Sequence, residues 1–270
     1  MNFYKSRDAA KVVYTCVVGD YDRLYPPVEK DPDTRYIALT DDPDLRAPGW
    51  KTQLISLETD LSPSLLNRYC KLFPWKFFPL ATRSVYVDGN IRILSSLSRL
   101  FDLIDDGYDI ALLRHPRRKY VSEEADACVQ HKKVKSVDII EAEISALKAA
   151  GYVDRGRLTE NNVIVRSHTS KELRSAMEGW WEFIQKYSGR DQMSLHHFLQ
   201  AENVKSLVLP FNVREPNPFF DIYPHFGSLN FWYERIACHN SARKREGQFH
   251  YFKYRLLRKL IRLFERKPSV

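Results

Sequence analysis

Apolar segments that end abruptly in polar residues constrain the fold of this chain more than any other feature. β-Branched and aromatic residues favour strands, whereas Asp, Gly and Asn favour turns. Each such segment is therefore predicted to be a buried strand that stops at a polar turn. The pairs of segment and turn are 11–18 before Gly19-Asp20-Tyr21-Asp22, 35–40 before Asp41-Asp42, and 85–87 before Asp88-Gly89-Asn90.

Strands alternate with helical or loop crossovers, and this pattern predicts an α/β protein with a mostly parallel, mixed sheet flanked by helices. No repeat or clear linker occurs before about residue 240, so we expect one domain (1–240) and a tail (241–270). With 44% hydrophobic residues the chain can bury a full core. Further strands are predicted at 51–57, 109–113, 162–166 and 206–209, and helices at 63–73, 97–104, 123–149, 171–187 and from 190 onward.

Parallel strands meet at one edge of a sheet, so the polar turns are expected to line one crevice. There Tyr21 can stack on a base, and Asp88 with Asn90 can hold a divalent cation against a diphosphate. Arg68 and Lys71 lie one turn apart on a predicted helix and can neutralise phosphate charge. Each residue alone also fits an ordinary turn, cap or solvated face; the joint arrangement favours a nucleotide site. The residues expected to bind a nucleotide sugar are Thr15, Gly19, Tyr21, Thr40, Asp41, Arg68, Lys71, Asp88, Gly89 and Asn90.

A second polar cluster follows the strand predicted at 109–113. Its basic side chains suit an anionic or hydroxyl-rich ligand, and a solvated charge run is the alternative. The residues expected to bind an acceptor are His115, Arg117, Arg118, Glu124 and Gln192.

Two carboxylates are candidates for a general base beside an acceptor hydroxyl. Asp191 opens a predicted helix, where an Asp also serves as a cap. Glu160 is the rival and is predicted to lie just before a strand. His225, in an aromatic, turn-like context, is a further candidate metal ligand beside Asp88 and Asn90.

Short motifs follow one another between residues 11 and 215: Val13–Asp22, Tyr36–Asp42, Arg68–Lys71, Tyr86–Asn90, Arg114–Arg118, Glu124–Cys128 and Arg190–Gln192. As an ordered set they resemble the TOD/MUCI-type glycosyltransferase-like family, formerly a domain of unknown function. That family includes plant mucilage-polysaccharide proteins, and some members carry the label alkaline ceramidase.

The resemblance implies a GT-A-like fold, in which an Asp-x-Asp motif holds a divalent metal on the diphosphate of a nucleotide sugar. Asp88-Gly89-Asn90 lies at that position. Asn90 replaces the second carboxylate, which leaves one anionic ligand fewer. We therefore expect Mn²⁺ or Mg²⁺ to bind weakly, or to be dispensable with Arg68 and Lys71 in its place.

The tail carries all of the excess positive charge. The net charge is +8, and residues 243–267 contain ten Lys or Arg and two Glu, so the remainder is neutral. Apolar residues recur every three or four positions from Phe249 to Phe264, with basic residues between them, which is typical of an interfacial helix. We expect an anionic membrane surface as its partner. A helix packed on its own domain is the alternative, and no recognition motif favours nucleic acid.

The expected function is transfer of a sugar from a nucleotide sugar to a carbohydrate or lipid-linked glycan acceptor. Residues 1–7 lack an apolar signal segment, no run is long enough to span a bilayer, and the four cysteines are far apart. We therefore expect a bacterial protein on the inner face of the cytoplasmic membrane that takes part in surface-polysaccharide synthesis. The alternatives are a non-catalytic membrane-surface protein that binds nucleotide or glycan, and an amide hydrolase. For the hydrolase, neither a G-x-S-x-G motif nor a zinc-binding His set is present.

Overall fold

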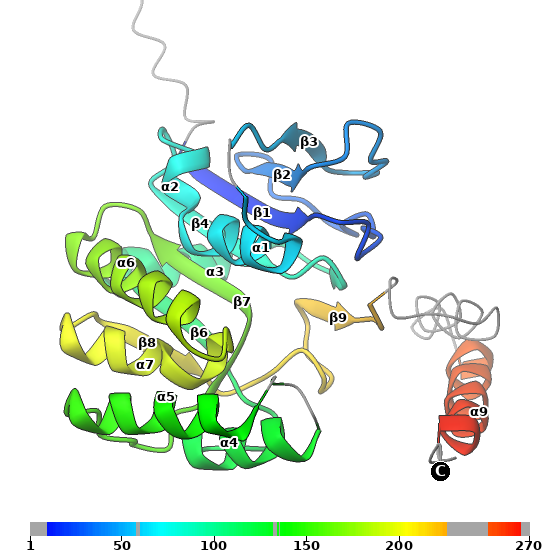
Figure 1. Cartoon of the computed structure of the whole chain (residues 1–270). Helices are drawn as coiled ribbons and strands as arrows, with labels where there is room; N and C mark the ends of the chain where they lie inside the picture. Colours follow the sequence, from blue (N-terminus) through cyan, green and yellow to red (C-terminus); the bar gives the residue numbers. More distant parts are fainter. Residues whose placement is uncertain (1–9, 58–59, 132–133, 135, 226–247, 266–270) are drawn as a thin grey trace, which may run out of the picture.

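The protein is built on a seven-stranded sheet with the order β3-β2-β1-β4-β7-β6-β8. The computed structural model describes residues 10–57, 60–131, 134, 136–225 and 248–265. Within this sheet every neighbouring pair is parallel except the two pairs that include β7, which is antiparallel to both β4 and β6. The expected mostly parallel, mixed α/β sheet is confirmed (Figure 1). The strands are β1 (Lys11–Val17), β2 (Arg35–Thr40), β3 (Lys51–Leu54), β4 (Arg83–Val87), β6 (Ile110–Arg114), β7 (Thr159–Ser167) and β8 (Ser206–Leu209).

Helices cover both faces of the sheet (Figure 1). The first of them begins as expected, because the Ser62 hydroxyl accepts a hydrogen bond from the Leu65 amide at 3.4 Å and Pro63 occupies the first helical turn. The described helices are α1 (Pro63–Leu72), α2 (Pro74–Phe77), α3 (Ser98–Asp105), α4 (Val121–Gln130), α5 (Val137–Ala149), α6 (Lys171–Lys186), α7 (Asp191–Ala201) and α9 (Gln248–Glu265).

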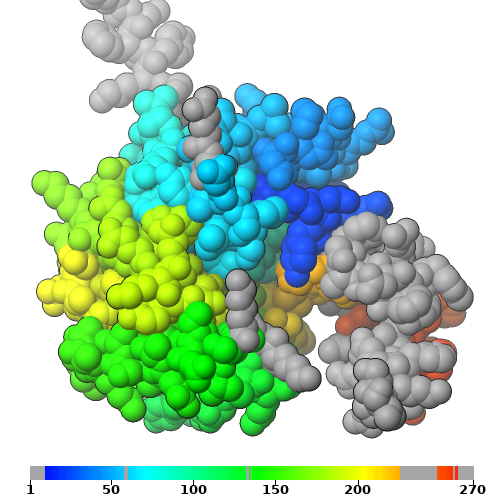
Figure 2. Space-filling view, viewed as in Figure 1, coloured from blue at the N-terminus to red at the C-terminus, as the bar shows by residue number. Residues whose placement is uncertain are grey.

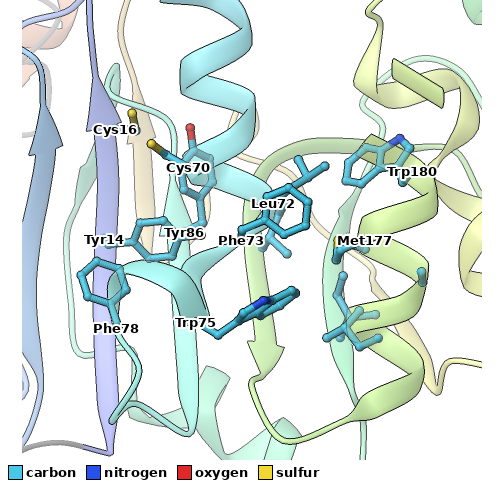
Figure 3. Packing of buried hydrophobic residues seen from close by; sticks show 14 of the residues in the cluster. Tyr14, Cys16, Cys70, Leu72, Phe73, Trp75, Phe78, Tyr86, Met177 and Trp180 are labelled. Carbon is cyan, nitrogen blue, oxygen red and sulfur yellow. The ribbon is translucent and has the colours of Figure 1, made fainter. Parts of the chain in front are cut away.

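Successive residues of the strands supply two apolar cores, one on each face. Val13 and Val17 of β1 pack on the face that α3 covers, whereas Tyr14 and Cys16 pack on the face that α1, α6 and α7 cover. Figure 3 shows this second core, where Tyr14 and Tyr86 lie against the end of α1. Their ring centroids are 5.2 Å apart in an edge-to-face arrangement. The near-continuous apolar strands in the sequence thus reflect a sheet buried on both faces.

Two helices occupy the span 123–149, which was predicted to be predominantly helical. α4 ends at Gln130 and α5 begins at Val137. Both helices contribute to a single apolar cluster with Met193 of α7.

A small antiparallel ribbon, β5 (Ile91–Ile93) with β9 (Phe220–Ile222), was not predicted. Strands of three residues are too short to show a periodic pattern. The ribbon matters for the site because it brings residues after 222 beside the turn that follows β4. The Tyr223 amide donates to the Asn90 carbonyl at 2.9 Å.

The C-terminal helix α9 carries a row of exposed apolar side chains, Phe249, Phe252, Leu256 and Leu260. The boundary expected near residue 240 lies outside the described residues, as do the side chains of Leu263 and Phe264. No described helix combines the length and apolar character needed to cross a bilayer.

Candidate active site

A cavity of about 870 Å³ opens at the edge of the sheet where the parallel strands end. The antiparallel strand β7 begins at this same edge, so Glu160 and Asn161, its second and third residues, line the cavity. In Figure 2 the surface is hollowed below the cyan segment of α1, with the gold β9 segment beside it. The cavity lies outside β1 and β4, where the strand order reverses, which is the usual ligand site of an open α/β sheet.

Most of the residues singled out from the sequence line this cavity. They follow strands β1, β4, β6 and β9, or lie on β7, on α1 and at the start of α7. They are Gly19, Tyr21, Arg68, Lys71, Asp88, Gly89, Asn90, His115, Arg117, Arg118, Glu160, Asp191, Gln192 and His225.

Four of the expected residues do not line the cavity. Thr15 is fully buried inside β1, and the Thr40 hydroxyl accepts from the Asp42 amide at 3.1 Å. The Asp41 carboxylate accepts from the Gly19 amide at 3.0 Å, so it holds the loop after β1. Glu124 is fully buried behind the arginines of the second cluster. These side chains support the walls of the cavity rather than facing it.

The loop after β1 packs tightly against the Asp88-Gly89-Asn90 turn. A Cβ atom on Gly89 would lie 3.0 Å from both Asp22 Cβ and Val17 Cγ2, so a larger residue would require these neighbours to shift. Gly19 has φ +65°, a conformation that glycine adopts without strain. The glycines therefore set how closely the two strand ends approach each other.

One wall of the cavity, the α1 side, is formed by α1 and the turn after β4, and Lys71 is the cation at its centre. Its Nζ lies 2.9 Å from Asp191 Oδ2 and 3.7 Å from Asp88 Oδ1, and its side chain is 5% exposed. The ammonium also lies 5.2 Å from the centre of the Tyr86 ring, whose hydroxyl donates to Asp88 Oδ1 at 2.9 Å. One ammonium group is thus shared between the two carboxylates of this side.

The two carboxylates differ in basicity. Burial raises the pKa of Asp88, and Lys71 only partly opposes it. Burial also acts to raise the pKa of Asp191, but Lys71, Arg68 and Arg190 outweigh it and hold that pKa at about 2. A general base is most effective when its pKa is near the working pH. The ion pair with Lys71 therefore lowers the basicity of Asp191, whose role as the general base stays a prediction.

The position of Lys71 is fixed from below by buried polar groups. The Tyr14 hydroxyl donates to the Lys71 carbonyl at 2.9 Å. The fully buried Arg166 guanidinium donates to the Leu72 carbonyl at 3.3 Å and lies 3.4 Å from the Tyr14 oxygen. Together these contacts tie the last turn of α1, and with it Lys71, to β1 and β7.

Asp88, Asn90 and His225 were expected to hold a divalent metal, and the structure places their elements together. His225 Nδ1 lies 3.1 Å from both oxygens of Asp22, which turns Nε2 toward the Asn90 amide at 3.5 Å. Burial acts to lower the pKa of His225, but Asp22 outweighs it and raises that pKa. A carboxylate on one ring nitrogen is a common support for a histidine ligand.

The donor set of one carboxylate, one carboxamide and one imidazole suits Mn²⁺ or Mg²⁺ only with modest affinity, because it carries a single negative charge. Within the described part of the chain no three His, Cys, Asp or Glu side chains lie close enough to form a metal site on their own. The residues present thus fit a weakly held cation. Asn90 would bind it through a neutral amide oxygen, at the position where the Asp-x-Asp motif has a second carboxylate.

Glu160 lies within β7 rather than before it, which corrects the expected boundary. Its Oε1 accepts from Arg214 Nε at 2.8 Å. The other oxygen, Oε2, is buried and has no hydrogen-bond partner among the described residues. Glu160 itself lines the cavity.

Several cavity residues were not assigned a role from the sequence. Asp22 and Arg190 lie inside motifs that were recognised, so their position was a usable signal. Asn67, Asn162 and Arg214 gave none, because nothing in their neighbouring residues marks them as polar groups of a site. Arg214 reaches the cavity only because the chain after β8 turns back across it.

The comparisons with known proteins agree with this fold. The model of the TOD1/MUCI70, glycosyltransferase-like domain matches residues 50–225, more than half of the chain. No curated protein sequence matches the chain.

Among solved structures, the apo WbbM bifunctional glycosyltransferase aligns with a TM-score of 0.51 at 13% identity. The alignment covers 89% of this chain and 46% of WbbM, so the chain spans less than half of that protein. Apo mouse xyloside xylosyltransferase 1 aligns over 74% of this chain and 85% of its own, with 9% identity and a TM-score of 0.44. The likeness to WbbM shows the GT-A-like fold that the motifs implied.

Proposed function

We propose that this chain, which belongs to the TOD1/MUCI70 glycosyltransferase-like family, transfers a sugar from a nucleoside-diphosphate sugar to a carbohydrate or lipid-linked glycan. The observation that carries the proposal is the convergence of Tyr21, Asp88 and Lys71 at the point where the strand order reverses. An exposed ring, a carboxylate turn and a buried ammonium match the base, the metal site and the diphosphate of such a donor.

The chemical demand of glycosyl transfer is stabilisation of the departing diphosphate. Lys71 and Arg68 extend from one face of α1 into the cavity, where their charges can neutralise it. A divalent cation bound by Asp88, Asn90 and His225 would add Lewis-acid stabilisation of the same leaving group. Tyr14 and Arg166 act indirectly, because they hold the turn of α1 that carries Lys71.

An acceptor hydroxyl must also lose a proton if the reaction inverts the anomeric centre. We assign this role to Glu160 rather than Asp191, since Asp191 is held as an anion of low basicity by Lys71. Glu160 lines the cavity, and its buried Oε2 has no hydrogen-bond partner among the described residues. Arg214 fixes the other oxygen, so the carboxylate is oriented.

A panel of nucleotide sugars, with and without Mn²⁺, tests the proposal by release of nucleoside diphosphate and by thermal shift. At least one member should raise the melting temperature and be turned over. Asp88→Ala should abolish turnover, whereas Asp102→Ala, an exposed residue of α3, should have no effect. Binding without turnover in the presence of glycan acceptors would favour a non-catalytic binding protein. Absence of any nucleotide binding would contradict the proposal.

We also propose that α9 holds the protein on an anionic membrane surface, at the inner face of a bacterial cytoplasmic membrane where surface polysaccharide is made. Phe249 is 72% and Leu260 43% exposed, and the apolar row between them is accompanied by exposed Lys253, Arg255 and Lys259. Each basic residue near such a surface contributes roughly 1 kcal/mol, and salt screens the attraction.

Vesicle sedimentation tests the membrane proposal directly. The double variant Phe252→Ser and Leu256→Ser should lose binding to vesicles with anionic lipid but keep nucleotide binding. Lys171→Gln, an exposed site at the start of α6, is the matched control and should bind like wild type. Equal sedimentation of the double variant and wild type would rule out α9 as the anchor.

A further inference from the structure

On the side of the cavity away from α1, two arginines meet at one buried carboxylate. Glu124 of α4 is fully buried, and its Oε2 lies 2.5 Å from Arg118 Nε. Its other oxygen lies 3.6 Å from the Arg190 guanidinium, which comes from the residue just before α7. The two guanidinium groups belong to distant parts of the sequence and are held together by this single carboxylate.

Both arginines also face the cavity. Their side chains are 20% and 23% exposed, and both residues line it. A guanidinium has five N–H donors in a fixed fork, so a carboxylate at its back leaves donors for a second oxyanion in front. Glu124 therefore orients the arginines without using up their capacity to donate.

The loop that carries these groups is held in shape by a neutral histidine. His115 Nδ1 accepts from the Arg117 and Arg118 amides at 3.2 and 2.8 Å. Burial, helped by Arg118, lowers the pKa of His115 to about 4. The imidazole is consequently uncharged near pH 7, and the charge of the loop comes from its arginines.

Arg117 adds a further positive charge. It is exposed and lines the cavity, and among the described residues its guanidinium is not part of an ion pair. Glu124 is the carboxylate in ion-pair distance of Arg118 and Arg190 among the described residues, and with Arg117 unpaired this wall keeps an excess of positive charge. The α1 side differs, because Lys71 there is balanced by Asp88 and Asp191.

The arginine group is adjacent to the proposed donor site but distinct from it. Arg190 and Asp191 are consecutive, and Asp191 is turned toward Lys71 while Arg190 contacts Glu124. An anion bound by the arginines would therefore sit beside the diphosphate, on the side from which an acceptor approaches.

From this geometry we infer that Arg117, Arg118 and Arg190 form an oxyanion subsite for an acidic acceptor, one that carries a phosphate or a carboxylate group. The inference rests on the proposed glycosyl transfer and specifies the chemical class of its acceptor. Two sources supply such a group, the phosphate of a lipid-linked glycan and the carboxylate of a uronic acid. Bidentate donation by arginine suits either of them.

Calorimetric titration of the full-length protein with methyl phosphate, methyl glucuronide and neutral methyl glucoside tests the subsite. The titrations are repeated with saturating nucleoside diphosphate, so that the donor site is filled. We expect at least one charged probe to bind in both conditions and the neutral glucoside to bind in neither. Preference for methyl phosphate points to a lipid-linked phosphate, and preference for the glucuronide points to a uronic acid.

The variants Arg117→Gln and Arg190→Gln should weaken binding of the charged probe about tenfold to a hundredfold, the effect of a lost hydrogen bond between charged groups. Arg99→Gln, on an exposed face of α3, should leave it unchanged. Arg118→Gln is avoided, because it would leave Glu124 buried without its nearest cation. Melting temperatures confirm that each variant is folded.

Three results would overturn the subsite: equal binding by wild type and both arginine variants, displacement of the charged probe by nucleotide, or equal binding of the neutral glucoside. Failure of the proposed function gives a different result, since the nucleoside diphosphate itself would then not bind to the wild-type protein.

Discussion

The two sides of the cavity arrange their buried charges in opposite ways. On the α1 side Lys71 is shared by Asp88 and Asp191, so two carboxylates surround one ammonium group. On the α4 side one buried carboxylate, Glu124, is surrounded by arginines. The first arrangement can bind a metal as well as a diphosphate, whereas the second can bind only anions. The difference indicates how one continuous cavity distinguishes a donor from an acceptor.

The contrast also extends to the carboxylates that remain available for chemistry. Asp191 is neutralised by Lys71 and has a pKa of about 2, whereas Glu160 keeps one oxygen without a partner among the described residues. Proton transfer is therefore expected on the acceptor side of the cavity and charge stabilisation on the donor side.

The largest expected effect comes from removing the proposed base. Glu160→Gln is nearly isosteric and should reduce transfer by ~10²–10⁴ while leaving donor binding intact. Asp191→Asn should reduce transfer less and should weaken donor binding, because it releases Lys71. Steady-state kinetics on both variants would separate the roles. A larger loss of turnover in Asp191→Asn with unchanged KM would return the base to Asp191.

Lys71→Met tests the donor side and should reduce transfer by ~10²–10³, the effect of losing one stabilising charge at the leaving group. It should also destabilise the fold by about 3–5 kcal/mol, because Asp191 is left without its partner. Urea unfolding measures the stability, and nucleotide titration measures binding. Lys76→Met, a partly exposed residue of α2, is the matched control. Unchanged nucleotide binding in Lys71→Met would contradict the assignment.

Asn90→Asp sharpens the same side by adding the carboxylate that the turn lacks. We expect Mn²⁺ affinity to rise about tenfold, the range seen for single changes around a metal site. Mn²⁺ electron paramagnetic resonance reports the free ion directly and does not depend on activity. If the affinity stays unchanged, the Asn90 side chain does not face the cation.

The smallest effect expected is on the pH dependence of stability. Burial lowers the pKa of His115 and His196 to about 4. Unfolded histidine binds a proton near pH 6.5. The unfolded state therefore takes up protons first, and stability should fall as the pH decreases from about 6.5 to 4.

Asp191 behaves oppositely, because its pKa is lowered to about 2. Its contribution is present above the unfolded value near 3.8 and is lost only as the pH falls toward 2. Urea unfolding between pH 7 and 4 measures the histidine effect together with the opposing effect of the raised pKa values of His225 and Asp88, so the pH dependence of wild type is compared with that of His196→Gln, which should be weaker. An equal pH dependence in the two proteins would contradict the burial of a neutral His196.

The donor side was largely predictable from the sequence and the acceptor side was not. Tyr21 and Asp88 follow parallel strands directly, so their meeting at one edge required only the strand pattern. Glu160 reaches that edge because β7 is antiparallel, which no local pattern indicates. His225 reaches the Asn90 turn through a ribbon of three-residue strands.

The burial of Glu124 could not be predicted from the sequence either. Glu124 lies on a helix with neighbours that suggest an exposed face, and it was expected to contact an acceptor. It is fully buried because Arg118 and Arg190 converge on it from different elements. Long-range pairing of this kind depends on tertiary contacts, so periodicity and local propensity do not reveal it.

The division of the cavity is tested most directly by titrating one nucleoside diphosphate into three proteins: wild type, Lys71→Met and Arg117→Gln. If the donor binds on the α1 side, Lys71→Met should weaken binding tenfold or more, while Arg117→Gln should bind as wild type does. The opposite pattern, with binding lost in Arg117→Gln and kept in Lys71→Met, would place the nucleotide on the α4 side and contradict the account.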